Sequence, residues 1–255
     1  MWCAASGAAR LHKGTTLEYA LQAGAFFDRA LALDPRNVEA LVATAFVDVL
    51  AAAAYLADDS KLRFARAEEA LTMALSLPPR HAKSHLFLGF VQIHTNRVDR
   101  GIAECQQALA LDHNLALAHG IVGLAKVFAG HPEETESHVL EALRLSPRDN
   151  EAYNWIMFVG VAKLCLGRDE EAAEWLHRSV ESNRNIPVAH FHLAAALAQL
   201  SRLDEARAAV AAGLALNPTF TIRRYRKAVR SEDAVVRTQG YRLVEAMRKA
   251  GVPEG

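Results

Sequence analysis

The chain has few of the residues on which covalent chemistry and metal binding usually depend. Its three cysteines, Cys3, Cys105 and Cys165, stand far apart in 255 residues and form no CxxC pair. This spacing indicates neither a disulfide framework nor a zinc ribbon, and it favours a reducing compartment. The glycines are scattered and form no phosphate-binding motif. We therefore expect no metal and no cofactor.

An excess of charge of either sign is also absent. The 29 lysines and arginines balance 29 aspartates and glutamates, so no global attraction draws the chain to nucleic acid or to an anionic membrane. One basic segment stands out, and we interpret it as a solvated face rather than a nucleic-acid contact. Its residues are Arg223, Arg224, Arg226, Lys227 and Arg230.

Long apolar runs are scarce. The longest, from Leu41 to Ala57, is short for a membrane span and carries Asp48 in its middle. It therefore predicts a buried helix. The N-terminus MWCAASGAARLHKG lacks the basic start and long apolar core of a secretory signal. We expect no membrane partner and a cytoplasmic location.

What the chain does have is alanine, leucine and a repeated pattern. In six segments a small residue is followed by a bulky one, a second small one, and a closing proline or its substitute. The sets are Ala23, Phe27, Ala30, Pro35; Ala67, Leu71, Ala74, Pro79; Gly101, Cys105, Ala108, His113; Thr135, Val139, Ala142, Pro147; Ala172, Leu176, Ser179, Arg184; Ala206, Val210, Gly213, Pro218. The closing positions step by 44, 34, 34, 37 and 34 residues. This period and order of sizes resemble the second helix of the tetratricopeptide repeat.

The first helix of each repeat should carry a large residue, then a leucine and a small residue, then another large one; the sequence supplies the first three positions with substitutions. The sets are Leu41, Thr44, Ala45; His85, Leu88, Gly89; His119, Val122, Gly123; Tyr153, Ile156, Met157; His190, Leu193, Ala194. The small residues let paired helices approach closely. Ten extra residues before Pro79 predict longer helices there. Three extra before Arg184, with Met157 where a small residue belongs, predict looser packing.

We identify an all-α tetratricopeptide-repeat superhelix, an α-solenoid of antiparallel helix pairs, over about Leu17 to Pro218. Residues 1–36 form an incomplete first repeat, residues 37–219 form about five tandem units, and residues 220–255 form the basic segment and a C-terminal capping helix. The chain enters the array without a polar cap. Either something packs there or the chain is the arm of a larger protein.

Four segments resemble a narrower group, the C-terminal repeat region of bacterial multidomain signalling proteins. In these a class III adenylate/guanylate cyclase domain, or a winged-helix DNA-binding domain, precedes the repeats. The resemblance implies a regulatory or partner-binding arm. Two alternatives are a relative whose cyclase domain is absent from this chain, and an accessory subunit of a transcriptional regulator. The segments are GIAECQQALALDHNLALAH, EETESHVLEALRLSPRDN, NRNIPVAHFHLAAAL and FTIRRYR…MRKAGVPEG.

Apparent chemical groups have structural interpretations at this period. Cys105 takes the bulky position of a second helix, which predicts a buried, unreactive thiol. His85, His119 and His190 occupy equivalent positions, so we expect a ladder of packing side chains about 10 Å apart. That spacing is too long for one metal ion. A pH-sensitive interface is the alternative. The carboxylates of HPEETES fall in a first helical turn, where they oppose the helix dipole.

The first helices should line a concave groove, and its predicted lining is apolar. A groove of this kind suits an amphipathic helix or apolar segment of a protein partner. The alternatives are that the C-terminal helix or a missing N-terminal domain fills it. We expect no enzyme, and serine at Phe90 and Phe128 should abolish capture without loss of stability. The predicted lining is Phe46, Leu86, Phe90, Ile93, Leu124, Val127, Phe128, Asn154, Phe158 and Phe191.

Overall fold

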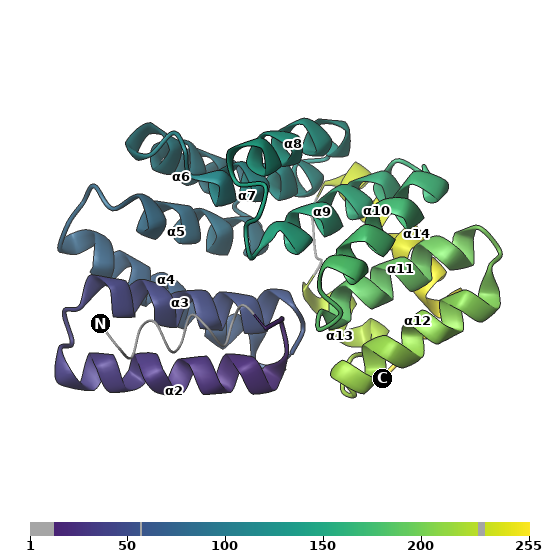
Figure 1. Ribbon diagram of the computed structural model, residues 1–255, viewed down its shortest axis with the longest axis horizontal. Helices are drawn as coiled ribbons and strands as arrows, with labels where there is room; N and C mark the ends of the chain where they lie inside the picture. Colours follow the sequence, from purple (N-terminus) through teal and green to yellow (C-terminus); the bar gives the residue numbers. More distant parts are fainter. Residues whose placement is uncertain (1–12, 57, 229–232) are drawn as a thin grey trace. The chain divides into compact units, whose positions relative to one another are not determined.

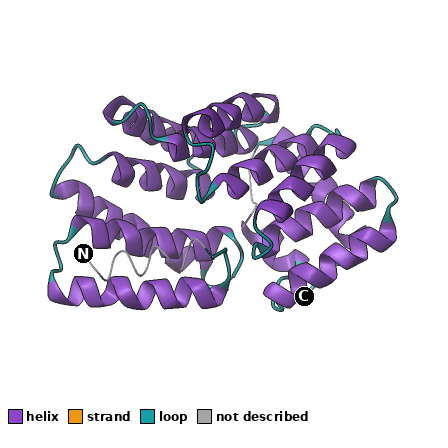
Figure 2. Cartoon of the chain, viewed as in Figure 1, coloured by secondary structure: helices purple, strands orange, loops and turns teal. Residues whose placement is uncertain are grey.

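The computed structural model describes residues 13–56, 58–228 and 233–255, and every regular element in these ranges is a helix (Figures 1 and 2). The prediction of an all-α chain is confirmed. Residues 1–12 of the predicted incomplete first repeat, which include Cys3, lie outside the described residues, and so does Arg230 of the predicted basic segment. The helices are α2 (Leu17–Leu33), α3 (Val38–Ala53), α4 (Ser60–Ser76), α5 (Ala82–His94), α6 (Val98–Leu111), α7 (Ala116–Phe128), η1 (Pro132–Glu134), α8 (Thr135–Leu145), α9 (Ala152–Cys165), α10 (Asp169–Ser182), α11 (Pro187–Gln199), α12 (Leu203–Leu216), α13 (Ile222–Ala228) and α14 (Ala234–Ala250).

The helices pack as consecutive pairs within two compact units, residues 1–118 and 119–255. In the first unit α3 pairs with α4 and α5 with α6, while α2 packs on α3. In the second unit α9 pairs with α10 and α11 with α12, and α14 packs mainly on α11. The boundary between the units falls within α7. Each unit is described below by itself.

In the first unit the paired backbones touch at glycine. A Cβ added to Gly89 of α5 would lie 2.6 Å from the Gly101 carbonyl oxygen of α6 and 2.8 Å from the Cys105 sulfur. No real Cβ fits at those distances, so α5 and α6 approach as closely as two helices can. The same small-against-small contact was predicted from the repeat pattern.

Polar side chains tie the first unit together at its loops and between its helices. Asn37 caps α3 by accepting a hydrogen bond from the Ala40 amide, which satisfies one of the free amides of the first turn. The carboxylate of Asp48, buried in α3, pairs with Arg63 of α4 at 3.0 Å. This pairing explains how an acidic residue is accommodated in the most apolar run of the sequence.

The second unit corrects the predicted register of the fifth repeat. A Cβ on Gly160 of α9 would lie 2.5 Å from Leu176 of α10, the contact that Gly89 makes with Cys105 and Gly123 makes with Val139. In all three pairs the glycine precedes the bulky residue by 16 positions. Gly160 therefore takes the small position that we gave to Met157. The three extra residues precede this position, and the prediction of loose packing was wrong because α9 and α10 touch at Gly160.

Candidate functional site

The residues predicted to line a groove are mostly buried in the structure. Leu86, Ile93 and Phe191 are fully buried, and Phe90, Leu124, Val127 and Phe158 keep less than a tenth of their surface exposed. Phe46, Phe128 and Asn154 are half-buried. Only these last three present surface to a partner without a rearrangement. Partner binding by the others stays a prediction, and it requires that a covering element move.

In the first unit the predicted phenylalanines join an aromatic cluster. The Phe46 ring of α3 lies 4.7 Å from the Phe87 ring of α5, measured between centroids. The Phe90 ring packs edge-on against His94 at 4.6 Å, and His94 also lies 5.6 Å from Phe64 of α4. Aromatic pairs in these geometries contribute packing energy beyond their buried area. Phe90 is therefore part of the core of this unit.

In the second unit Phe191 packs inside its own repeat. A Cβ added to Gly213 of α12 would lie 2.8 Å from the Phe191 ring, so the ring fills the space that this glycine leaves. On its other side the ring stacks on Phe220 at 3.9 Å between centroids. The corrected register also moves Phe158. Its equivalent in α5 is Phe87, whereas the position of Phe90 is taken in α9 by Val161.

The first helix of the sixth repeat, α11, is covered on all sides. Every residue from Pro187 to Ala198 is buried. Neighbouring helices α10 and α12 pack on two sides, and α14 provides the third contact (Figure 1). In α14 the buried residues fall on one stripe, while its other face is exposed and polar. The chain's own C-terminal helix thus packs across first helices, with smaller contacts to α9 and α12.

One arginine of α14 makes the polar contact with the fifth repeat. Arg242 donates to the Leu164 carbonyl oxygen at 2.6 Å and pairs with Asp169 at 2.5 Å. Leu164 lies in the last turn of α9 and Asp169 begins α10, so one guanidinium joins a helix C-terminus to a carboxylate. Nothing in the sequence pattern pointed to a pairing of Arg242 with Asp169.

The end of the chain closes on α13. The Ile222 amide donates to the Pro253 carbonyl oxygen at 2.8 Å, and the Arg223 amide donates to that of Glu254 at 3.0 Å. Glu254 also pairs with Arg248 through its side chain. The first amides of α13 are therefore satisfied by the chain itself. In the predicted basic segment this contact involves only the backbone of Arg223, and the interpretation of its side chains as a solvated face stays a prediction.

The predicted histidine ladder is a set of loop contacts. Both ring nitrogens of His85 form hydrogen bonds: Nδ1 with the Glu104 carboxylate at 2.6 Å, and Nε2 with the Pro79 carbonyl oxygen, which accepts, at 3.0 Å. His190 contacts the Arg184 carbonyl oxygen at 3.0 Å. In both cases the ring reaches the closing position six residues earlier. This contact explains why an imidazole stands there, since it satisfies a carbonyl of the turn between repeats. His119 is half-buried, and a pH-sensitive role for the set stays a prediction.

The two described cysteines are poor nucleophiles. Burial raises the pKa of the Cys105 thiol to about 12, and the nearby Glu104 carboxylate adds to the shift. Burial likewise raises the pKa of Cys165 to about 12, against the opposing effect of Arg242. A thiol of this kind holds almost no thiolate at neutral pH. The surroundings of Cys105 agree with the predicted buried, unreactive thiol.

Two buried ionisable groups were not singled out by the sequence patterns. Burial raises the pKa of the Glu151 carboxyl to about 7, although Asn154 donates to it at 2.8 Å. The His192 ring is fully enclosed, and neither nitrogen has a hydrogen-bond partner. Burial lowers the pKa of His192 to about 4. Its short distance from His190 in sequence gave no sign of this, because residues two apart in α11 lie on different faces of the helix and meet different neighbours.

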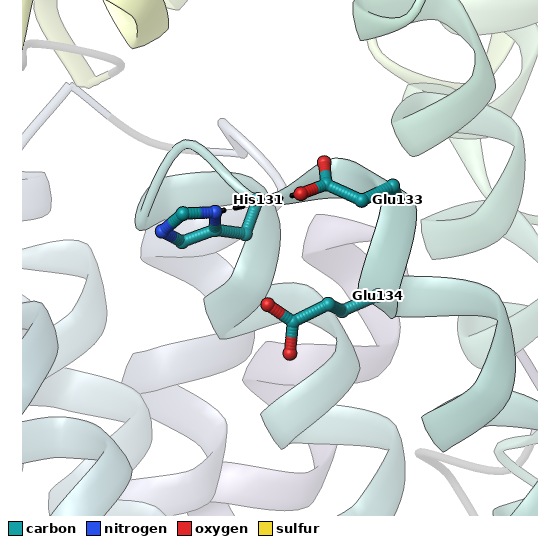
Figure 3. Close-up of side chains that lie close together, drawn as sticks. All are labelled: His131, Glu133 and Glu134. Carbon is teal, nitrogen blue, oxygen red and sulfur yellow. Dashed lines mark ion pairs between the residues drawn. The ribbon is translucent and has the colours of Figure 1, made fainter.

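One group of possible metal ligands lies at the start of the fourth repeat's second helix (Figure 3). His131, Glu133 and Glu134 bring one ligand atom each within 4.8 Å of the others. Two of the three residues are exposed. His131 pairs with Glu133 at 3.4 Å, and Glu134 pairs with Lys126 at 2.7 Å. The carboxylates sit in the first turn of η1 and α8. Their arrangement fits the predicted opposition to the helix dipole.

Comparisons with known proteins identify the fold. No protein-family model and no curated protein matches the sequence. Among solved structures, the APC/C hetero-tetramer Cut9–Hcn1 matches with a TM-score of 0.61 at 17% identity, over 88% of this chain and 39% of that chain. TTC0263, a thermophilic TPR protein of Thermus thermophilus, matches with a TM-score of 0.57 at 20% identity, over 74% of this chain and 93% of that one. The fold is a tetratricopeptide-repeat α-solenoid.

The likeness extends to the fold and no further. At these identities it carries no partner or activity, and the chain spans about two fifths of the matched Cut9–Hcn1 chain. The prediction of the repeat solenoid is confirmed. The resemblance to cyclase-associated repeats rests on the four sequence segments alone and stays a prediction. Among the described helices, none is long and apolar enough to cross a membrane; the cytoplasmic location is a prediction.

Proposed function

We propose that the chain is a noncatalytic scaffold that binds a protein partner through the faces of its first helices. The observation that carries this proposal is the packing of α14, an amphipathic helix, on α11 and α9. A face that holds one amphipathic helix has the shape and polarity to hold another. The partner segment that fits is an amphipathic helix or an apolar stretch of similar pattern.

The ionisable groups support a structural rather than a catalytic use. Lys163, which is buried in α9, pairs with Glu136 at 2.6 Å and with Glu171 at 2.9 Å, and so links α8, α9 and α10. Arg97 forms a two-pronged pair with Glu68. Charges paired in this way hold helices together. Together with the unreactive thiols, these pairs support the noncatalytic part of the proposal.

Site-specific photocrosslinking tests the proposal with matched positions. A benzophenone amino acid replaces Phe46 of α3 or Asn154 of α9, both half-buried on first helices, or replaces Glu69 of α4 or Glu174 of α10, both exposed on second helices. In lysate of the source organism we expect one protein to be crosslinked from positions 46 and 154 and not from 69 and 174. Crosslinks from the second helices alone would place the binding surface elsewhere.

The setting that we propose is a bacterial cyclase-type signalling system, in which the chain is a regulatory or partner-binding arm. This part is supported only by the resemblance of the four segments named above. Its test is the identity of the crosslinked protein. A cyclase or its associated regulator supports the setting, whereas a DNA-binding regulator supports the transcriptional alternative. Cyclic nucleotide formation by the purified chain itself would contradict the noncatalytic proposal.

A further inference from the structure

We propose that α14 is an exchangeable occupant of the first-helix face of α9 and α11, and that a partner's basic amphipathic helix with the α14 pattern takes its place. This inference rests on the proposed function and specifies its ligand. It concerns contacts within residues 119–255 alone. Four observations carry it.

The first observation is the path of α14, which runs across the ends of successive first helices. A Cβ on Gly130, in the turn after α7, would lie 3.8 Å from Val236 near the start of α14. Arg242, in its middle, contacts Leu164 at the end of α9. Beyond this point the main packing is on α11. A helix that merely continued the array would pack chiefly on the preceding second helix, α12, as α11 packs on α10.

The second observation is the pattern that α14 presents to this face. Its buried residues are spaced so that they share one stripe, and most of its remaining residues are exposed, Val235 and Tyr241 among them. Its charge is strongly basic, with only Glu245 acidic. The helix is thus an amphipathic segment of the kind that binds grooves. The buried stripe is Val236, Leu243, Val244, Ala246, Met247 and Ala250.

The third observation is a pair of acceptors that fits an arginine. The Leu164 carbonyl oxygen and the Asp169 carboxylate both accept from the Arg242 guanidinium. One planar, always charged group with several donors fills both acceptors, which a lysine ammonium does less well. Asp169 is largely buried, with 15% of its side chain exposed. If α14 left without a replacement, the Asp169 carboxylate would lose this countercharge, so a replacing helix needs a cation there.

The fourth observation is that α14 carries a residue that lowers its helical stability. Gly240 lies in the middle of the helix, and a Cβ added to it would meet nothing within 4 Å. Packing therefore does not require glycine at this position, although glycine costs a helix interior about 1 kcal/mol relative to alanine. The helix is weakened at its centre without any gain in contact. Such a segment opens more readily than the repeats that it covers.

These observations define the partner by its chemistry. It is a helix with apolar residues spaced as Val236, Leu243 and Met247 are, that is, seven and then four residues apart. An arginine directly precedes the middle apolar residue, and the outer face is polar and basic. The probe that represents this chemistry is a synthetic, fluorescein-labelled peptide of residues 233–252, and its binding to the full chain is followed by fluorescence anisotropy.

Two variants shift the competition in opposite directions. Arg242→Gln removes the ion pair from the attached helix only, so the peptide, which keeps its arginine, should bind about tenfold more tightly than to the unmodified chain. Gly240→Ala strengthens the attached helix, so the peptide should bind about fivefold more weakly. The second variant adds helix stability, which keeps the test sound if the first variant folds poorly.

The matched control is Asp169→Asn, which removes the acceptor from both helices. It should give the peptide no gain, and a peptide carrying glutamine at position 242 should bind Arg242→Gln no more tightly than the arginine peptide binds the unmodified chain. Equal affinity for all variants, or no binding to any, would overturn the inference. The proposed function would still stand in that case if the photocrosslinks from positions 46 and 154 were obtained; their absence with intact peptide exchange would instead count against the proposed function.

Discussion

Among single residues, two glycines of this chain should respond in opposite ways to substitution by alanine. Gly89 lies against the α6 backbone, whereas Gly240 faces open space. Gly89→Ala should lower the free energy of unfolding by about 1–3 kcal/mol, because the added methyl group forces α5 and α6 apart. Gly240→Ala should raise it by up to about 1 kcal/mol. Urea denaturation of both variants checks the pair; a loss of stability at position 240 would show that its surroundings are misjudged.

Phe90 provides a second residue-scale prediction, and it reverses our expectation from sequence. We expected serine at this position to leave stability intact, because the repeat register placed Phe90 on a groove. The structure buries the ring against His94. Phe90→Ser should therefore cost about 3–5 kcal/mol of unfolding free energy. A melting temperature within a degree or two of that of the unmodified chain would contradict the assignment of Phe90 to the core.

His192 predicts how the second unit responds to pH. Its pKa is lowered to about 4 by burial, while an unfolded histidine titrates near 6.5. Between these values the unfolded chain binds the proton and the folded chain does not. Stability is therefore complete above pH 6.5 and falls as the pH drops toward 4, by up to about 3 kcal/mol from this group. In His192→Leu that part of the loss should vanish, as urea denaturation at pH 7.5 and 4.5 can measure. An unchanged loss would contradict it.

The residue scale also shows what sequence could and could not predict. The slots of Cys105 and Gly89 followed from the repeat, since a solenoid imposes the same contact in every unit. The register of α9 was misassigned because we counted from Pro147, although the 16-residue spacing from Gly160 to Leu176 was available in the sequence. The His192 ring lies 6.0 Å from that of Tyr225 in α13, and Arg242 of α14 pairs with Asp169. Both contacts depend on how the C-terminal segment folds back, which no local pattern specifies.

At the scale of elements, the stability of α14 depends on its cap. Asp233 accepts from the Val235 and Val236 amides at 2.8 and 3.0 Å. Asp233→Ala should remove about 1 kcal/mol from the helix. The amides of α14 should then exchange with deuterium about fivefold faster, while those of α9 and α12 keep their rates. Acceleration spread equally over all these helices would show that α14 opens only with the whole unit.

The helices themselves were predictable because apolar residues recur at helical spacing and short polar side chains precede several of them. Thr16 and Asn37 cap α2 and α3, and α14 ends at Gly251 with a φ of 94°. The exposure of the predicted groove residues was harder to infer from the sequence. Its residues were taken from first helices of an open array, whereas here α14 covers α11 and most of the predicted residues are buried.

For the whole molecule, we propose that the chain binds a protein partner through helix faces and does not catalyse a reaction. Photocrosslinking from the first helices, compared with the matched second-helix positions, measures whether the chain binds a partner in this way. One protein should be crosslinked from positions 46 and 154, with none from 69 and 174, and the purified chain should form no cyclic nucleotide. Crosslinks from the second helices alone, or turnover of ATP or GTP to the cyclic nucleotide by the chain itself, would contradict this proposal.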